Sequence, residues 1–187
     1  MRSDARRNVV RLLDAAEEVF ARDGLAVPVD VIAARAGVGV GTLYRHFPTK
    51  QALFKAVVAT RLQGLVERAK DLSDYPDAGE AIFTFVAEVA KLAMQKQDLT
   101  DELARAGIDE EEIHSTVREQ LEKAFEVLLR RAQAAGAVRR DITTPEVAAL
   151  LMGTCLAARM RGASLTTPRL VTVLCDGLRT NRVAAKP

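Results

Sequence analysis

The sequence predicts an all-α protein, and two features of its pattern support this. Apolar residues recur at intervals of three and four along the 187 residues, as they do on one face of a helix. No series of residues alternates between apolar and polar in the way that half-buried strands do. Glycine and proline fall where the periodic stretches stop, so each stretch is expected to form a separate helix.

Four helices are predicted in the first 70 residues. The first ends at Gly24, and its inward face carries Val9, Leu13, Ala16 and Phe20. Two short helices follow at about 29–36 and 40–47, with Gly37 between them. Thr49 is expected to cap the fourth helix, whose apolar face carries Leu53, Val57, Leu62 and Val66.

The rest of the chain is predicted to form five further helices. Residues 71–77 contain Ser, Asp, Tyr and Pro and are expected to be a linker. The helices beyond it are expected over about residues 78–96, 99–106, 109–135, 145–161 and 168–182. Thr144 and Thr167 each precede a proline, so each is expected to cap the helix that it opens.

Composition excludes several classes of protein. A chain of this length with 49% hydrophobic and 28% charged residues is typical of a globular fold and not of a disordered segment. No apolar run is long enough for a membrane-spanning helix, and acidic residues interrupt any signal peptide. The cysteines Cys155 and Cys175 lie in apolar patterns, which indicates buried thiols and a reducing cytoplasm. Neither histidine has a neighbouring cluster of metal ligands, so no metal or other cofactor is expected.

Charge is strongly divided along a chain whose net charge is only +2. Residues 1–61 contain ten basic and six acidic residues, and residues 31–66 contain no acidic residue at all. Residues 71–126 contain five basic and fifteen acidic residues, whereas residues 127–187 contain ten basic and three acidic residues. An acid-free stretch near the N-terminus suits a surface that binds a polyanion, although a solvated basic face has the same composition.

The first three helices have the pattern of a helix-turn-helix unit, because the last two are short and are joined by a tight turn at Gly37. On a helical wheel the third helix turns Leu43 and Phe47 toward the core. Its opposite arc carries Gly41, Thr42, Arg45 and His46, with Val40 and Tyr44 at the flank. Gly41 has no Cβ, so this helix can approach a major groove closely. The glycines at 37, 39 and 41 do not form a nucleotide-binding loop, because they follow a helix and not a strand.

Residues 31–54 (VIAARAGVGVGTLYRHFPTKQALF) closely resemble the DNA-binding signature of TetR-family transcriptional regulators. Residues 12–24 (LLDAAEEVFARDG) resemble the first helix of that family, and residues 128–151 resemble the C-terminal domain of its SbtR-like members. The resemblance implies an all-helical homodimer of about nine helices per chain. It implies an N-terminal DNA-binding domain, here residues 1–52, and a ligand-binding and dimerisation domain, here residues 53–187, with the fourth helix spanning the boundary.

The resemblance also implies roles for individual residues. The helix-three residues Val40, Gly41, Thr42 and Arg45 would approach base edges of double-stranded operator DNA, while Tyr44, His46 and Lys50 would hold phosphates. The sequence departs from the family pattern at three polar positions. Pro28 and Val29 stand where the second helix usually has a Thr or Ser cap, and Gly39 and Val40 stand where Ser and Lys are common. Base recognition would then rest on Thr42, Arg45 and the backbone at Gly41, or on contact between Val40 and a thymine methyl group.

The leading hypothesis is a ligand-responsive repressor that an unknown small-molecule effector releases from DNA. A DNA-binding dimer that needs no ligand remains an alternative, whereas an enzyme is disfavoured because no paired acid and base are visible. The candidate pocket residues are Phe83, Phe85, Met94, His114, Phe125, Met152, Cys155 and Arg159. The last two helices are too apolar for a solvent-facing surface, so they are expected to dimerise through Leu150, Leu156, Met160, Leu170, Val173 and Leu174. No contact with a membrane is expected.

Overall fold

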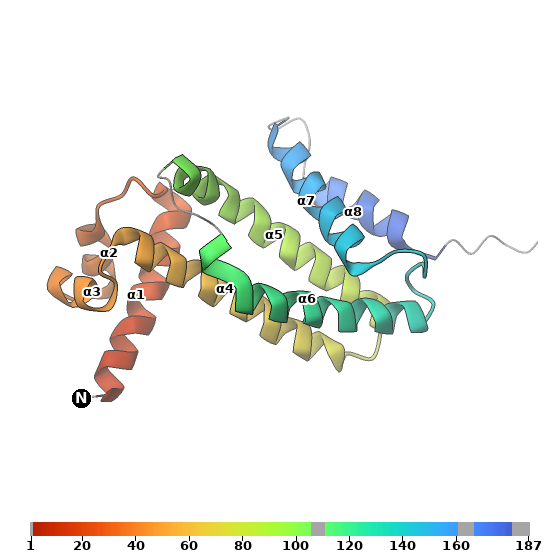
Figure 1. The fold of residues 1–187 in the computed structure, drawn as a ribbon, viewed down its shortest axis with the longest axis horizontal. Coiled ribbons are helices and arrows are strands. Elements are labelled where there is room, and N and C mark those ends of the chain that lie inside the picture. Colours follow the sequence, from red (N-terminus) through yellow and green to blue (C-terminus); the bar gives the residue numbers. More distant parts are fainter. Residues whose placement is uncertain (1, 106–110, 161–166, 181–187) are drawn as a thin grey trace, which may run out of the picture. The chain divides into compact units, whose positions relative to one another are not determined.

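The computed structural model describes residues 2–105, 111–160 and 167–180, and its helices are labelled in Figure 1. They are α1 (Arg2–Asp23), α2 (Val29–Ala36), α3 (Val40–His46), α4 (Lys50–Ser73), α5 (Ala78–Arg105), α6 (Glu111–Ala134), α7 (Thr144–Met160) and α8 (Thr167–Leu178). In this part of the chain the extended pairing is limited to an isolated bridge between Val138 and Arg179. The prediction of an all-α fold is confirmed.

The chain divides into two compact units. The first comprises residues 1–62 and 95–115, and the second comprises residues 63–94 and 116–187. The helices α4, α5 and α6 therefore each contribute residues to both units. The DNA-binding domain expected over residues 1–52 lies wholly within the first unit, and its boundary stays a prediction.

The first unit has a single apolar core to which α1, α2, α3 and the first half of α4 contribute. Its largest fully buried side chains are Leu12, Phe20, Ile32, Leu43, Leu53 and Phe54. The rings of Phe20 and Phe54 meet edge to face, with their centroids 5.8 Å apart, and so join α1 to α4. The predicted inward residues Val9 and Leu13 are only partly buried, because α1 turns Leu12 and Val19 most directly into the core.

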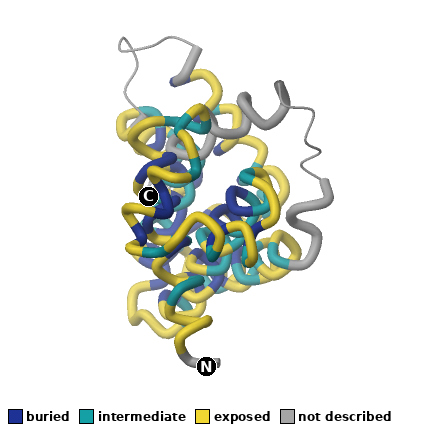
Figure 2. Tube along the Cα trace, turned by 90° about the vertical axis from the view of Figure 1, so that its left-hand side faces the viewer, coloured by how far each residue is buried: buried dark blue, intermediate teal, exposed yellow. Residues whose placement is uncertain are grey.

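The second unit has its own apolar core, and in both units buried positions alternate with exposed ones around the helices (Figure 2). Phe85 of α5 and Phe125 of α6 lie at the centre of this core, with their rings 5.6 Å apart. From α7 and α8 it receives Val147, Leu151, Cys155, Val171, Cys175 and Leu178. Every one of these positions recurs at helical spacing, which is why the sequence pattern anticipated the fold.

Two predicted elements differ in the structure. The separate helices expected at 78–96 and 99–106 form the continuous helix α5, because neither glycine nor proline occurs between residues 80 and 105. The cap of α7 is Thr143 and not Thr144. The carboxylate of Glu146 accepts hydrogen bonds from the amide of Thr143 at 2.7 Å and from its hydroxyl at 2.6 Å, and the first of these is one of the two bonds of a capping box.

Two further observations concern the described residues alone. None of their helices is long and apolar enough to cross a membrane. No group of three or more His, Cys, Asp or Glu residues among them is placed to hold a metal ion.

Candidate nucleic-acid interface

The turn between α2 and α3 depends on Gly37. This residue ends α2 with φ of 64°, a left-handed conformation that favours glycine. The amides of Gly37 and Val38 donate to the carbonyls of Ala34 and Ala33 at 3.0 Å each, so the last turn of α2 is closed. The chain then reaches α3 within three residues, which holds the two helices in the helix-turn-helix arrangement.

Arg11 of α1 fixes this turn from outside. Its guanidinium donates to the carbonyl of Ala36 through Nε at 2.9 Å and to the carbonyl of Gly37 through Nη2 at 2.8 Å. These carbonyls belong to the end of α2, where helix amides no longer supply donors. A Cβ on Gly37 would lie 2.9 Å from the same Nη2 atom. Sequence reasoning missed this role, because an arginine in a basic segment has no sign of a partner 25 residues away.

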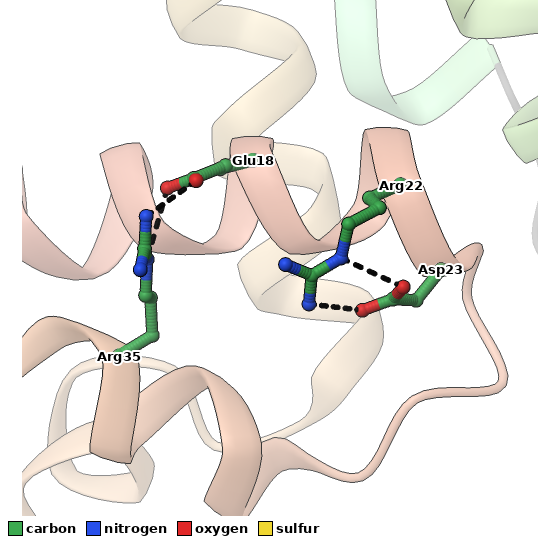
Figure 3. Close-up of polar contacts among 4 residues, drawn as sticks. All are labelled: Glu18, Arg22, Asp23 and Arg35. Atoms are coloured by element: carbon green, nitrogen blue, oxygen red, sulfur yellow. Dashed lines mark hydrogen bonds and ion pairs between the residues drawn. The ribbon is translucent and has the colours of Figure 1, made fainter.

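Two ion pairs join α1 to its neighbours and remove basic residues from the candidate surface. Glu18 pairs with Arg35 of α2, whose Nε lies 3.0 Å from Oε2, and this hydrogen-bonded guanidinium lowers the pKa of Glu18 (Figure 3). Glu17 lies 2.9 Å from Nε of Arg61 of α4, whose side chain is only 10% exposed. Two of the basic residues in the acid-free stretch are therefore occupied within the fold, and the stretch offers DNA fewer charges than its composition indicates.

The helix α3 presents the faces that its sequence predicts. Leu43 and Phe47 are buried in the core of the first unit. The opposite arc has exposed Arg45 and half-buried Thr42 and His46, and Tyr44 is exposed at the flank. A Cβ built on Gly41 would meet nothing within 4 Å, so the backbone there is open to an approaching surface. Gly41, Thr42 and Arg45, three of the four residues predicted to contact bases, thus share an outward arc of α3.

The N-terminus of α3 is bare, as the departures from the family pattern indicate. Gly39 occupies the cap position of α3 and makes no side-chain hydrogen bond, and Pro28 does the same for α2. Val40 follows with its side chain 38% exposed. An apolar side chain at this position needs no hydrogen-bond partner and can contact a thymine methyl group in the major groove.

Lys50 lies where two helices begin. Its ammonium donates to the carbonyl of Val27, the residue before the cap of α2, while Lys50 itself opens α4. Thr49 caps α4 as predicted, and its hydroxyl accepts from the amide of Ala52 at 3.0 Å. The contact with Val27 places the positive charge beside the start of α2, close to the helix-turn-helix unit. The contact thus joins the start of α4 to the segment before α2, which the sequence did not predict.

The second surface predicted from the sequence is the dimer interface in the C-terminal half of the chain, and it stays a prediction. Leu150 and Leu156 of α7 and Val173 of α8 are 49%, 42% and 60% exposed, although each is apolar. An open groove of about 910 Å³ is lined by α7, α8 and the segment before α7. Its lining is mostly apolar, with Leu150, Gly153, Leu170, Val173 and Leu174 among it, but it also includes the charged Arg139, Asp141 and Glu146. The side chain of Met160 lies outside the described residues.

The predicted pocket residues do not all lie together in the structure. Phe85, Phe125 and Cys155 lie together in the core of the second unit, and the ring of Phe83 packs against its edge beneath Arg179. Met152 is 45% exposed on α7 and does not join them. The side chains of the remaining three candidates are outside the described residues, namely Met94, His114 and Arg159.

Comparison with known families decides the class of this chain. Residues 12–57 match bacterial regulatory proteins of the tetR family. Residues 77–180, more than half of the chain, match the C-terminal domain of SbtR-like transcriptional regulators. The chain belongs to the TetR family of transcriptional regulators. This is a non-enzymatic class whose members bind DNA, and both resemblances predicted from the sequence are confirmed.

Solved structures agree with this assignment. A TetR regulatory protein from Mycobacterium vanbaalenii is 40% identical, with a TM-score of 0.77 over 95% of this chain and 98% of that chain. A TetR regulator from Streptomyces coelicolor is 30% identical, with a TM-score of 0.75 over 92% of this chain and 99% of that chain. A gamma-butyrolactone receptor is 26% identical, with a TM-score of 0.63 over 94% and 90% of the two chains. Among named relatives, an HTH-type regulator of Staphylococcus aureus is 35% identical over 75 residues, and the match spans 40% of each protein.

Proposed function

We propose that this TetR-family regulator is a ligand-responsive repressor that binds a palindromic operator as a homodimer in the cytoplasm. The observation that carries the proposal is the outward face of α3. It combines an open backbone at Gly41 with the donors Thr42 and Arg45, on a helix that Leu43 anchors in the core. A helix held in this way can enter a major groove without losing its packing.

The proposed contacts divide into two kinds. Thr42, Arg45 and the methyl groups of Val40 would contact base edges in the major groove, which is where sequence is recognised. Tyr44, His46 and Lys50 would contact phosphates, which set position and supply affinity that depends on salt. Arg35 donates two hydrogen bonds to Glu18 of a neighbouring helix, and Arg61 is only 10% exposed, so we assign neither of them a direct contact with DNA.

The homodimer is supported by the apolar groove along α7 and α8. A helix that is apolar on all sides requires cover on all sides, and α7 buries only one side within its own unit. A second copy presents the same surface, so a two-fold axis along this groove would cover both copies at once. Two-fold symmetry in turn requires a palindromic operator, with half-sites roughly 34 Å or a small multiple apart.

Release by an effector would act through α4. This helix begins beside the helix-turn-helix unit at Lys50 and continues to Ser73 in the second unit. An effector can weaken operator binding only if it binds the released conformation more tightly than the DNA-bound one. The loss of operator affinity then cannot exceed the ratio of these two effector affinities. A tenfold release requires about 1.4 kcal/mol of such preference, which is within reach of a small ligand in an apolar pocket. The similarity to a gamma-butyrolactone receptor supports a small-molecule effector without identifying it.

A DNA-binding dimer that needs no ligand is the second candidate, and one observation favours it. Phe85 and Phe125 contact each other, and the Sγ atom of Cys155 lies 4.0 Å from the carbonyl of Ala90. Three of the predicted pocket residues therefore lie packed together in the core of the second unit. The two candidates differ in whether any small molecule weakens operator binding.

The test has two stages. Selection from randomised DNA should first yield a palindromic site, and titration at several salt concentrations should give its affinity. A panel of metabolites should then be tested for release of that operator. A true effector lowers the affinity of the protein for its operator by some factor. By linkage, the operator must then lower the affinity of the protein for that effector by the same factor. Failure to select any palindrome would contradict the proposal, and equal effector affinity with and without operator would identify that compound as no inducer.

A further inference from the structure

Residues 4–7, in the first two turns of α1, contribute no side chain to the core of the first unit. Asp4, Ala5, Arg6 and Arg7 are all exposed, and the first fully buried residue of α1 is Leu12. Figure 2 shows these turns as an exposed segment next to the N-terminus. An isolated helical segment that packs on nothing adds little stability by itself. These turns are therefore available for contacts outside the protein.

One stripe of α1 follows the helix-turn-helix unit. Glu18 on this stripe pairs with Arg35 near the end of α2, and Arg11 binds the carbonyls of Ala36 and Gly37 in the turn. Arg7 precedes Arg11 by four residues and so lies on the same face, about 6 Å further along the helix. The stripe thus continues beyond the turn that leads into α3, and Arg7 is the next side chain on it.

The present partner of Arg7 is one that DNA can replace. Its guanidinium pairs with Asp4 one turn earlier, and the two side chains are 72% and 62% exposed. Such an exposed pair contributes little to stability, because water screens it. Arg7 reaches Asp4 through its Nη2 atom, whereas a phosphate can accept two parallel hydrogen bonds from the same guanidinium. Binding to DNA also releases condensed counterions, so exchange of Asp4 for a phosphate is favourable.

We propose that the first two turns of α1 form a second DNA-contacting element, in which Arg7, assisted by Arg6, binds backbone phosphates that flank each half-site. The element recognises no bases and extends the footprint of the dimer outward from each recognition helix. This inference rests on the proposed operator binding by α3. The two proposals differ in the helix involved, which is α1 here, and in the DNA groups contacted, which are phosphates alone here and include base edges for α3.

The main test pairs protein variants with operator length. The selected operator is prepared with natural flanks and with each flank trimmed to the palindrome. Arg7→Ala removes two phosphate contacts per dimer, so it should reduce the slope of log affinity against log salt by about 2. Affinity for the long operator should fall roughly 10- to 100-fold at 0.1 M salt, equally for every half-site sequence. When the flanks are trimmed, the operator affinity of the wild-type protein should fall by a similar factor, and that of Arg7→Ala should hardly change.

Matched variants separate this role from a general effect of charge. Arg130 of α6 is 76% exposed and pairs within its own helix with Glu126, as Arg7 does with Asp4. Arg130→Ala should leave affinity and salt slope unchanged. Arg7→Lys retains the charge and should restore most of the slope. Asp4→Asn removes the carboxylate that competes for Arg7, so it should strengthen binding to the long operator and leave binding to the trimmed operator unchanged.

The outcomes distinguish the two proposals. If a palindrome is selected but wild-type and Arg7→Ala proteins respond equally to trimming, the α1 element does not exist and the function of α3 stands. If no palindrome is selected, the proposed operator binding itself fails. A change in base preference on Arg7→Ala would also overturn the assignment, since a phosphate contact carries no direct sequence information. Melting temperatures of all variants should match wild type, because each replaced side chain is exposed.

Discussion

The guanidinium of Arg11 occupies the space that a Cβ on Gly37 would require. The same guanidinium binds the carbonyl of Gly37, so the turn and α1 determine each other's position. Glycine is favoured here for two independent reasons, namely its positive φ and the contact with Arg11. The orientation of α3 against the first unit therefore depends on a residue of α1 that has no part in the recognition face.

Gly37→Ala should destabilise the protein by about 1–3 kcal/mol, since an L-residue at this φ is strained and its methyl group displaces Arg11. Arg11→Ala should cost about 1–2 kcal/mol, because the charge-assisted hydrogen bonds to the turn are lost. Both changes should lower the melting temperature and operator affinity. Thermal unfolding followed by circular dichroism measures the first effect.

Gly41→Ala is the matched control for this prediction. A Cβ there meets nothing within 4 Å, and alanine favours a helix, so stability should not fall. In the Arg11→Ala background, Gly37→Ala should cost less than in the wild type, because the steric contact has gone. Additive effects of the two changes would contradict the proposed link between these residues.

The residues of the recognition surface should separate by their effect on specificity. Arg45→Ala and Thr42→Ala should change the preferred bases, with about 1–3 kcal/mol of discrimination lost at the affected position. Lys50→Ala should weaken binding to all sequences alike and reduce the salt slope by about one unit per subunit. Selection from randomised DNA with each variant measures both effects.

The assignment to Lys50 needs a stability measurement as well, because its ammonium also binds the carbonyl of Val27. Lys70→Ala is the control, since this exposed lysine of α4 pairs with Glu67 and lies in the second unit. A change of base preference on Lys50→Ala, with a uniform loss on Arg45→Ala, would show that the two roles are reversed.

The pH dependence of one ion pair follows from its geometry. Arg139 donates two hydrogen bonds to Asp141, at 2.7 and 2.6 Å, and these lower the pKa of Asp141 to about 2. The pair stabilises the fold above the ordinary pKa of 3.8, and this contribution is lost as the pH falls through about 2. A carboxyl titration by NMR should show the low value, and Arg139→Ala should return it toward 3.8. An unchanged pKa in the variant would contradict this cause.

Much of the first unit could be predicted because its information is local. Leu43 and Phe47 lie one helical turn apart, and Gly37 marks the turn, so the wheel alone separates the inner and outer faces of α3. The contacts that were missed join residues far apart in the sequence. Neither the hydrogen bonds of Arg11 to Ala36 nor the ion pair of Arg61 with Glu17 leaves a periodic signal.

The candidate pocket could not be predicted reliably from the sequence pattern. Large apolar residues at helical spacing, such as Phe85 and Phe125, follow the same pattern whether they fill a core or line a cavity. Only the packing distinguishes the two cases, and here their rings contact each other. The apolar face of α7 was predictable for a related reason, since a helix that is apolar on every side needs a second partner.

The surface of α7 and α8 gives a sharp test of the proposed homodimer. Val173 is 60% exposed, so Val173→Glu disturbs no packing within its own protomer but introduces a charge into the groove. Leu174 is a poorer choice, because it is half-buried and packs against the core of the second unit. Sedimentation should find wild-type dimers and Val173→Glu monomers at micromolar concentration. The variant should also lose operator binding, because each half-site alone is weak.

Two further variants establish whether the effect belongs to this surface. Gly153→Leu fills space that is open in the protomer, where a Cβ meets nothing within 4 Å, and should also prevent association. Val127→Glu places the same charge on α6 at a valine that is 54% exposed and does not line the groove, so it should leave the dimer intact. Wild-type monomers at micromolar concentration would contradict the proposed interface. Dissociation by Val127→Glu to the same extent would instead place the interface on another face of the second unit.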